Sequence, residues 1–209
     1  MTDFITSKGD YRDLIVFKKG ECIYDLTYHF AHRFLNRSDR TIDQMIQAAR
    51  SCKQNIIEGS AASKTSRETE IKLFNVAKAS LEELLADYED YIRVRGLAIW
   101  PSQKQLEVRE FCKRHNESAL YRQIAPNRND ETLANLTITM IHQELYLLFR
   151  LIEKAKRDFL EHGGIREEMS RARREFRNSN GRFGNGGNYG NGEKNGSYGN
   201  NGNGGNNGK

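Results

Sequence analysis

The chain has 209 residues, of which 37% are hydrophobic and 29% are charged, and its formal net charge at pH 7 is +5. No apolar run approaches the roughly 20 residues that cross a bilayer, and the opening MTDFITSKGD lacks the basic and apolar regions of a secretory signal. We therefore expect a cytoplasmic protein without a membrane partner, and the mild positive charge permits binding to nucleic acid without demonstrating it.

Helical periodicity begins near the N-terminus. Residues 11–35 are predicted to form a first helix whose apolar positions recur at helical spacing: Leu14, Phe17, Tyr24, Tyr28, Ala31 and Phe34. A second helix is expected from Thr41, and Gly59 is predicted to end it as the residue after the last turn. Residues 60–66, SAASKTS, then form a predicted loop of small residues.

Two capping boxes are expected to start the next helices. Thr65 with Glu68, and Ser102 with Gln105, have the spacing at which the two side chains satisfy each other's free backbone N–H groups. The first box predicts a third helix that Gly96 ends, and the second predicts a shorter, strongly charged helix.

The longest apolar stripe lies near the end of the folded region. A single helical turn is expected around Leu120, before a long helix that begins at Asp130 or Thr132. Gly163, followed by a second glycine, is predicted to end this helix.

These elements predict an all-α fold, an antiparallel four-helix bundle over residues 11–162 that includes shorter helices from about residue 100. A flexible N-terminus, residues 1–10, precedes it. Residues 163–177 are expected to form a basic polar helix or linker as a C-terminal extension. Residues 178–209 are rich in Gly and Asn and cannot bury enough apolar surface to offset their ordering entropy, so they are predicted to be a disordered tail.

The second predicted helix carries a line of small and polar residues beside its apolar face. We call this line the seam, and its members recur at alternating spacings of four and three: Gln44, Ala48, Ser51, Asn55 and Glu58. A helix needs one apolar face to join a fold, so a second line indicates a second contact. Two interpretations are open: an interface with another subunit, or a contact with the first or third helix of the same bundle.

Acidic residues cluster on the third predicted helix: Glu82, Glu83, Asp87, Glu89 and Asp90. The Glu-x-x-His pattern of a ferritin-like metal site is absent from the sequence, so no metal is expected here. We interpret the cluster as a solvated face, which could also dock a basic partner or the basic C-terminal helix of a neighbouring copy.

No set of residues in the sequence predicts an active site, a cofactor or a metal ion. His29 and His32 lie one helical turn apart and could ligate a metal, but no third ligand stands at a suitable spacing. His142 is expected to be structural, although an imidazole side chain leaves a role in proton transfer open. The cysteines are expected to be reduced and buried: Cys22, Cys52 and Cys112.

Basic and aromatic residues are interleaved at the C-terminal end: Arg171, Arg173, Arg174, Arg177, Arg182, Phe183 and Tyr189. In a flexible segment, such cations follow phosphates while the rings stack on bases, which is typical of single-stranded nucleic-acid binding. The alternative is a low-complexity tail that improves solubility or associates with itself.

Two motifs, QMIQAARSCKQNIIEG at residues 44–59 and AKASLEEL at residues 77–84, resemble the four helix bundle protein family. That family includes proteins encoded in intervening sequences of bacterial large-subunit ribosomal RNA and the accessory proteins of diversity-generating retroelements. Later motifs resemble a suffix domain found behind that bundle in some bacteria: Ala134-Asn135, Ile141-His142-Gln143, Leu147-Leu148, Phe159, Gly163-Gly164, Glu168 and Arg171.

The resemblance implies a bacterial protein that assembles as a homopentameric barrel and binds a reverse transcriptase and RNA. Together with the basic C-terminal end, it leads us to expect a non-enzymatic RNA- or ribonucleoprotein-binding accessory protein that forms a homo-oligomer. The alternative is a protein-interaction scaffold that uses its acidic third helix and does not bind nucleic acid.

Overall fold

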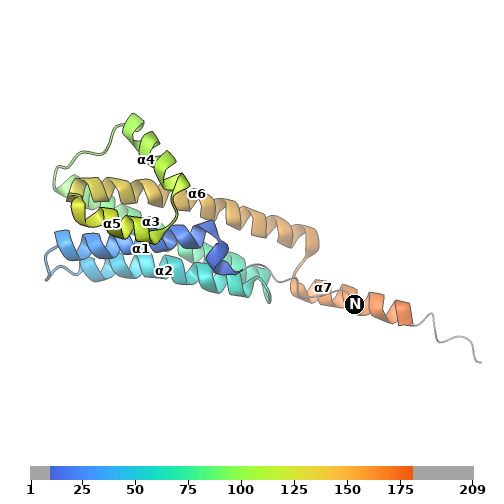
Figure 1. Ribbon diagram of the computed structural model, residues 1–209. Coiled ribbons are helices and arrows are strands. Elements are labelled where there is room, and N and C mark those ends of the chain that lie inside the picture. The colour runs from blue at the N-terminus through green and yellow to red at the C-terminus, as the bar shows by residue number, and fades with distance from the viewer. Residues whose placement is uncertain (1–9, 181–209) are drawn as a thin grey trace, which may run out of the picture. The chain divides into compact units, whose positions relative to one another are not determined.

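The computed structural model describes residues 10–180, and within this range every regular element is helical (Figure 1). The prediction of an all-α protein is confirmed for this part of the chain. None of the helices in residues 10–180 combines the length and the apolar character needed to cross a membrane. The elements, in chain order, are η1 (Tyr11–Asp13), α1 (Ile15–Phe34), α2 (Thr41–Ala62), α3 (Arg67–Val94), α4 (Ser102–Arg114), α5 (Ser118–Ile124), η2 (Ala125–Asn127), α6 (Asp130–His162) and α7 (Ile165–Asn180).

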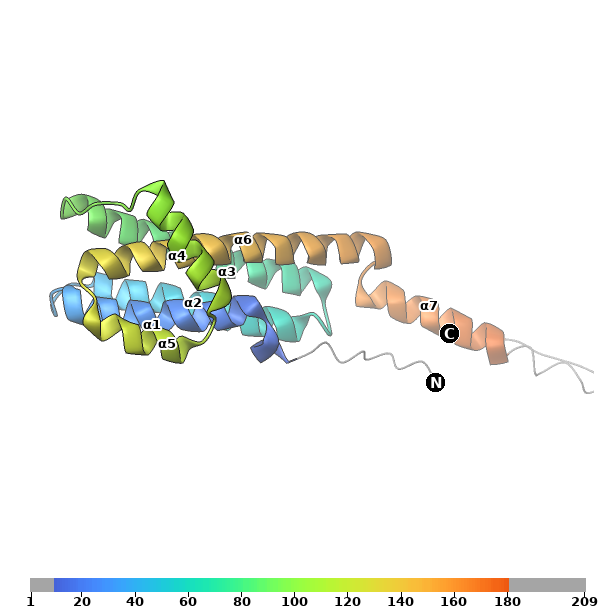
Figure 2. The ribbon, with the colours of Figure 1, turned by 45° about the horizontal axis from the view of Figure 1, so that its top comes forward.

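The long helices α1, α2, α3 and α6 pack against one another around a shared apolar core (Figures 1 and 2). Aromatic side chains form part of this core, where Phe30 of α1 lies against the rings of Tyr88 and Tyr91 of α3. The Tyr88 hydroxyl is also satisfied, because it donates to Thr27 at 3.1 Å. The short helix α5 packs on α1, and α4 crosses α6.

The first predicted helix is divided near its start. Asp10 accepts a hydrogen bond from the Arg12 backbone N–H and caps the short η1. Leu14 then has an extended backbone, with ψ at 127°, so α1 begins only at Ile15. The prediction of one continuous helix from Tyr11 is therefore wrong by one turn.

Gly59 does not end the second helix, because α2 continues to Ala62. The glycine is buried against α3, and a Cβ atom at this position would come within 2.6 Å of the Phe74 ring. Gly59 is thus required by the close approach of that ring to the α2 backbone. The predicted loop at residues 60–66 is correspondingly shorter, since only Ser63–Ser66 lies outside the helices.

We expect Gly59→Ala to lower the free energy of unfolding by about 1–3 kcal/mol, because the added methyl group must displace a buried ring. This loss should exceed the gain in helix propensity, which is about 1 kcal/mol for Gly to Ala. Urea unfolding followed by circular dichroism measures the change, with Ser60→Ala as the neighbouring control. An unchanged or higher stability of Gly59→Ala would contradict this close packing.

Both predicted capping boxes are wrong in detail, although the helices start close to the expected residues. Ser66, not Thr65, caps α3 by accepting from the Thr69 backbone N–H at 3.2 Å. Pro101 is the N-cap of α4 without a side-chain hydrogen bond, and the Gln105 amide donates to the Trp100 carbonyl instead.

The remaining boundaries agree with the sequence. Asn129 caps α6 by accepting from the Thr132 backbone N–H at 2.9 Å. Gly96 and Gly163 have φ values of 62° and 76°, which glycine adopts without strain, and each follows the end of a helix. The expected turn around Leu120 is the seven-residue helix α5.

The chain divides into two compact units after Met169, a position inside α7. The first unit contains the packed helices α1 to α6. In the second, the described residues are the C-terminal part of α7. The predicted flexible N-terminus and the Gly/Asn-rich tail lie outside the described residues except for Asp10 and residues 178–180.

Candidate nucleic-acid interface

Three aromatic side chains follow one another along α1 at intervals of four residues: Tyr24, Tyr28 and His32. Residues at this spacing lie above one another on a helix, so their rings meet. The Tyr28 and His32 rings are stacked, with centroids 4.3 Å apart and planes inclined by 25°. The Tyr24 and Tyr28 centroids are 6.3 Å apart. Tyr28 is 50% exposed, so this aromatic stack is open to solvent.

Cationic side chains lie around the aromatic stack. The Lys53 ammonium group of α2 is 4.5 Å from the centre of the Tyr24 ring. Arg33 follows the stack on α1 and donates to a backbone carbonyl of η2. Arg122 of α5 pairs with Asp25 at 2.7 Å while its own side chain stays 59% exposed. Three cations therefore border the stack, and Arg122 is paired with the Asp25 carboxylate.

A shallow hollow of about 710 Å³ lies over the stack, and Arg33, Arg122 and Ala125 form part of its lining. His29 also faces it, and its pKa is lowered by burial and by the neighbouring Arg33. His32 Nδ1 lies 3.0 Å from the Tyr28 carbonyl oxygen, to which only an N–H can donate. We call this surface the α1 hollow.

The two histidines considered as metal ligands are thus part of an aromatic and basic surface. Within residues 10–180, no group of three or more His, Cys, Asp or Glu side chains is placed to hold a metal ion.

The exposed position of Tyr28 corrects the sequence analysis, which placed this residue on the apolar face of the first helix. Tyr28 shares a face of the helix with Glu21, Asp25 and His32. These polar neighbours on the same face indicate an exposed position.

The seam residues of α2 lie beside α3. Gln44 and Glu58 are exposed, Ala48 is buried, and Ser51 and Asn55 are half-buried. The Ser51 hydroxyl is 2.9 Å from that of Ser80 on α3. The Asn55 amide donates to the Ser51 carbonyl of its own helix at 2.9 Å. The inner part of the seam therefore contacts the third long helix of the same chain.

The outer part of the seam borders an open groove between α2 and α3. Its volume is about 440 Å³, and its lining includes Gln44, Ala48 and Ser51 with the acidic Asp43 and Glu83. A contact between subunits at this groove stays a prediction.

The acidic residues of α3 spread along one exposed side of the helix. Asp87 is half-buried, and its pKa is raised by burial and by the nearby Asp90 and Glu83. Ion pairs join Glu82 to Lys78 at 3.2 Å and Asp90 to Arg93 at 2.6 Å.

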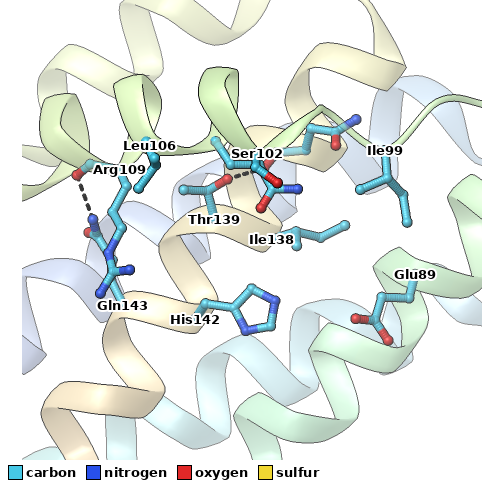
Figure 3. Close-up of a pocket in the computed structure, with 11 residues that line it drawn as sticks. Glu89, Ile99, Ser102, Leu106, Arg109, Ile138, Thr139, His142 and Gln143 are labelled. Carbon is cyan, nitrogen blue, oxygen red and sulfur yellow. Dashed lines mark hydrogen bonds between the residues drawn. The ribbon is translucent and has the colours of Figure 1, made fainter.

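A second hollow, of about 480 Å³, lies between α3, α4 and α6 (Figure 3). The exposed side chains of His142 and Glu89 face each other across it. Gln143 holds α4 in place, because its amide donates to the Arg109 carbonyl. Asn135 fixes the chain before α4 in the same way, since its side-chain oxygen accepts from the backbone N–H of Trp100 at 2.9 Å. These hydrogen bonds join α4 and the chain before it to α6.

The buried side chains include Glu144 and Lys19, which sequence reasoning did not find. Glu144 of α6 is fully buried, and burial raises its pKa to about 8, although Cys52 and Lys19 act in the opposite direction. Its nearest partner is the Cys52 thiol, 3.7 Å from Oε1. Lys19 is 3% exposed and donates to the Cys112 carbonyl at 2.7 Å. The cysteines are free and buried, as predicted: Cys22, Cys52 and Cys112.

The predicted nucleic-acid-binding residues of the C-terminal end divide between two regions. The described ones are exposed on α7: Arg171, Arg173, Arg174 and Arg177. The others lie outside the described residues: Arg182, Phe183 and Tyr189.

Comparisons with protein-family models, curated proteins and solved structures found no match to this chain. The assignment of a site therefore depends on the geometry above, and the family resemblance stays an expectation from its motifs.

Proposed function

We propose that this protein binds single-stranded RNA and that the α1 hollow is its principal contact surface. The observation that carries the proposal is the stacked pair Tyr28 and His32, open to solvent and bordered by Lys53, Arg33 and Arg122. Exposed rings bind bases by stacking, and the cations bind the phosphates between them, so such a surface tolerates many sequences.

The remaining expectations are part of the same proposal. The four long helices form an antiparallel four-helix bundle that assembles as a homo-oligomer through the α2 seam, in a non-enzymatic, cytoplasmic accessory protein. The open groove beside Gln44 and Ala48 supports a further helix contact there. A pentamer and a reverse-transcriptase partner are suggested by the family resemblance alone. The arginines of α7 provide a second contact for phosphates.

A salt titration tests the electrostatic part of this proposal. Lys53→Gln is expected to reduce the slope of log K against log salt by about 0.7 for single-stranded RNA, the value for one lost phosphate contact. Fluorescence anisotropy with a labelled oligouridine measures the slope, and Lys72→Gln on the exposed side of α3 is the matched control. Equal slopes for both variants would contradict a phosphate contact at the α1 hollow.

A protein-interaction scaffold is the second candidate function. The acidic lining of the α2/α3 groove by Asp43 and Glu83 favours a basic protein partner. The same titration separates the two functions, because a scaffold of this kind should show no RNA binding even at low salt.

A further inference from the structure

α7 carries its apolar residues in one narrow stripe. Met169, Ala172 and Phe176 follow one another at spacings of three and four, which is the a–d–a spacing of a coiled-coil heptad. Met169 is 48% exposed and Phe176 is 66% exposed. Among the described residues, this stripe is therefore largely uncovered, and a helix partner would bury it.

The charged residues beside the stripe differ in sign on its two sides. With Met169 and Phe176 at positions a, Glu168 and Glu175 occupy positions g, and Arg173 occupies position e. In a parallel pair of helices, a g residue faces the e residue of the next heptad in the partner. Glu168 of each copy would then meet Arg173 of the other copy. An antiparallel pair would bring g to g and e to e, and would set like charges against each other.

The same arrangement of charges favours a second copy of the chain, rather than a membrane surface, as the partner of the stripe. Glu168 and Glu175 border the stripe where anionic lipid headgroups would lie. Among the side chains that the structure describes on α7, the large apolar ones are Met169 and Phe176. Three further arginines lie at positions c, f and b, away from the stripe: Arg171, Arg174 and Arg177. Pairing would leave that side facing outward, toward phosphates.

We propose that α7 pairs in parallel with α7 of a second copy of this chain. The helix has 16 residues, which is only about two heptads, and isolated coiled coils usually need more. The pairing is therefore weak and depends on the concentration of the protein. It brings two chains together at their C-terminal ends, at a surface distinct from the seam of α2.

Disulfide trapping in the full-length protein tests the orientation. Phe176→Cys should form a cross-linked dimer under mild oxidation, because parallel pairing sets the two copies of this a position side by side. In an antiparallel pair of fully overlapping helices, Phe176 of one copy would lie opposite Met169 of the other. The two Phe176 positions would then be seven residues apart along the axis, or about 10 Å at a rise of 1.5 Å per residue. Arg174→Cys, at the outward f position, is the control, and the native cysteines are buried. Equal cross-linking of both variants, or none for Phe176→Cys, would overturn the proposal.

A charge exchange tests the contact between the two helices. Arg173→Glu places Glu opposite Glu168 and should weaken dimerisation at least several-fold in sedimentation equilibrium. The double variant Glu168→Arg with Arg173→Glu restores opposite charges and should recover the association of the native protein. Identical association of the native, single and double variants would show that α7 does not form this pair.

Discussion

Tyr28→Ala is expected to weaken the binding of single-stranded RNA by roughly 5- to 150-fold, because stacking on one aromatic side chain contributes about 1–3 kcal/mol per base. The substitution removes the ring that stacks on His32. Tyr28 is 50% exposed, so its loss should cost the folded protein little stability. Tyr28→Phe keeps the ring and should bind nearly as the native protein does.

Tyr146→Ala is the matched control for this prediction. Tyr146 lies on α6 outside the α1 hollow and is 52% exposed, so it is equivalent to Tyr28 in residue type and accessibility. Anisotropy titrations of the three variants with the same labelled oligouridine, at one low salt concentration, give the comparison. Equal affinities of Tyr28→Ala and Tyr146→Ala would remove the α1 hollow as the binding surface.

The free energy of unfolding of the native protein is expected to fall as the pH rises from about 5 to 8. The cause is Glu144, whose pKa rises from 4.5 to about 8 on folding because the carboxyl group is fully buried. Between these values the unfolded chain has released the proton while the folded protein still holds it. Deprotonation therefore favours unfolding, and the stabilisation lost across this window is on the order of 3–5 kcal/mol.

Glu144→Gln should remove this dependence on pH. Gln has nearly the same shape and no charge, so the variant should equal the native protein near pH 5 and exceed its stability near pH 8. Glu161→Gln, at an exposed position on the same helix, should keep the native dependence.

Urea unfolding at several pH values measures the effect. The buried Lys19 must be considered, since its pKa is lowered by burial and its deprotonation adds stability at higher pH. Lys19 is present in both proteins, so the difference between them isolates the contribution of Glu144. The same loss of stability in Glu144→Gln and the native protein would show that another group is responsible.

The helices and most of their ends could be read from the sequence, because they depend on residues only a few positions apart. The apolar stripe of α6, the Asn129 cap and the positive φ of Gly96 and Gly163 are all local features. The seam on α2 was also recognised from its spacing. Local patterns do not predict features that depend on residues far apart in the chain. Gly59 is one such case, because a glycine is required inside α2 where the Phe74 ring of α3 approaches the backbone.

The candidate site depends on such distant contacts even more. The sequence placed Tyr24 and Tyr28 on one helix but could not show that Lys53 and Arg122 would border them, since these come from α2 and α5. It also could not show which charged residues would be buried, because Glu and Lys are normally at the surface. Lys19 lies against a carbonyl 93 positions away in the chain, and Glu144 against a thiol 92 positions away.

The sequence by itself determined the helices, their apolar faces and most of their ends, because periodicity and capping act over a few residues. Only the tertiary structure decided which side chains are exposed together and which charges are enclosed, because exposure is set by the helices that pack against each face.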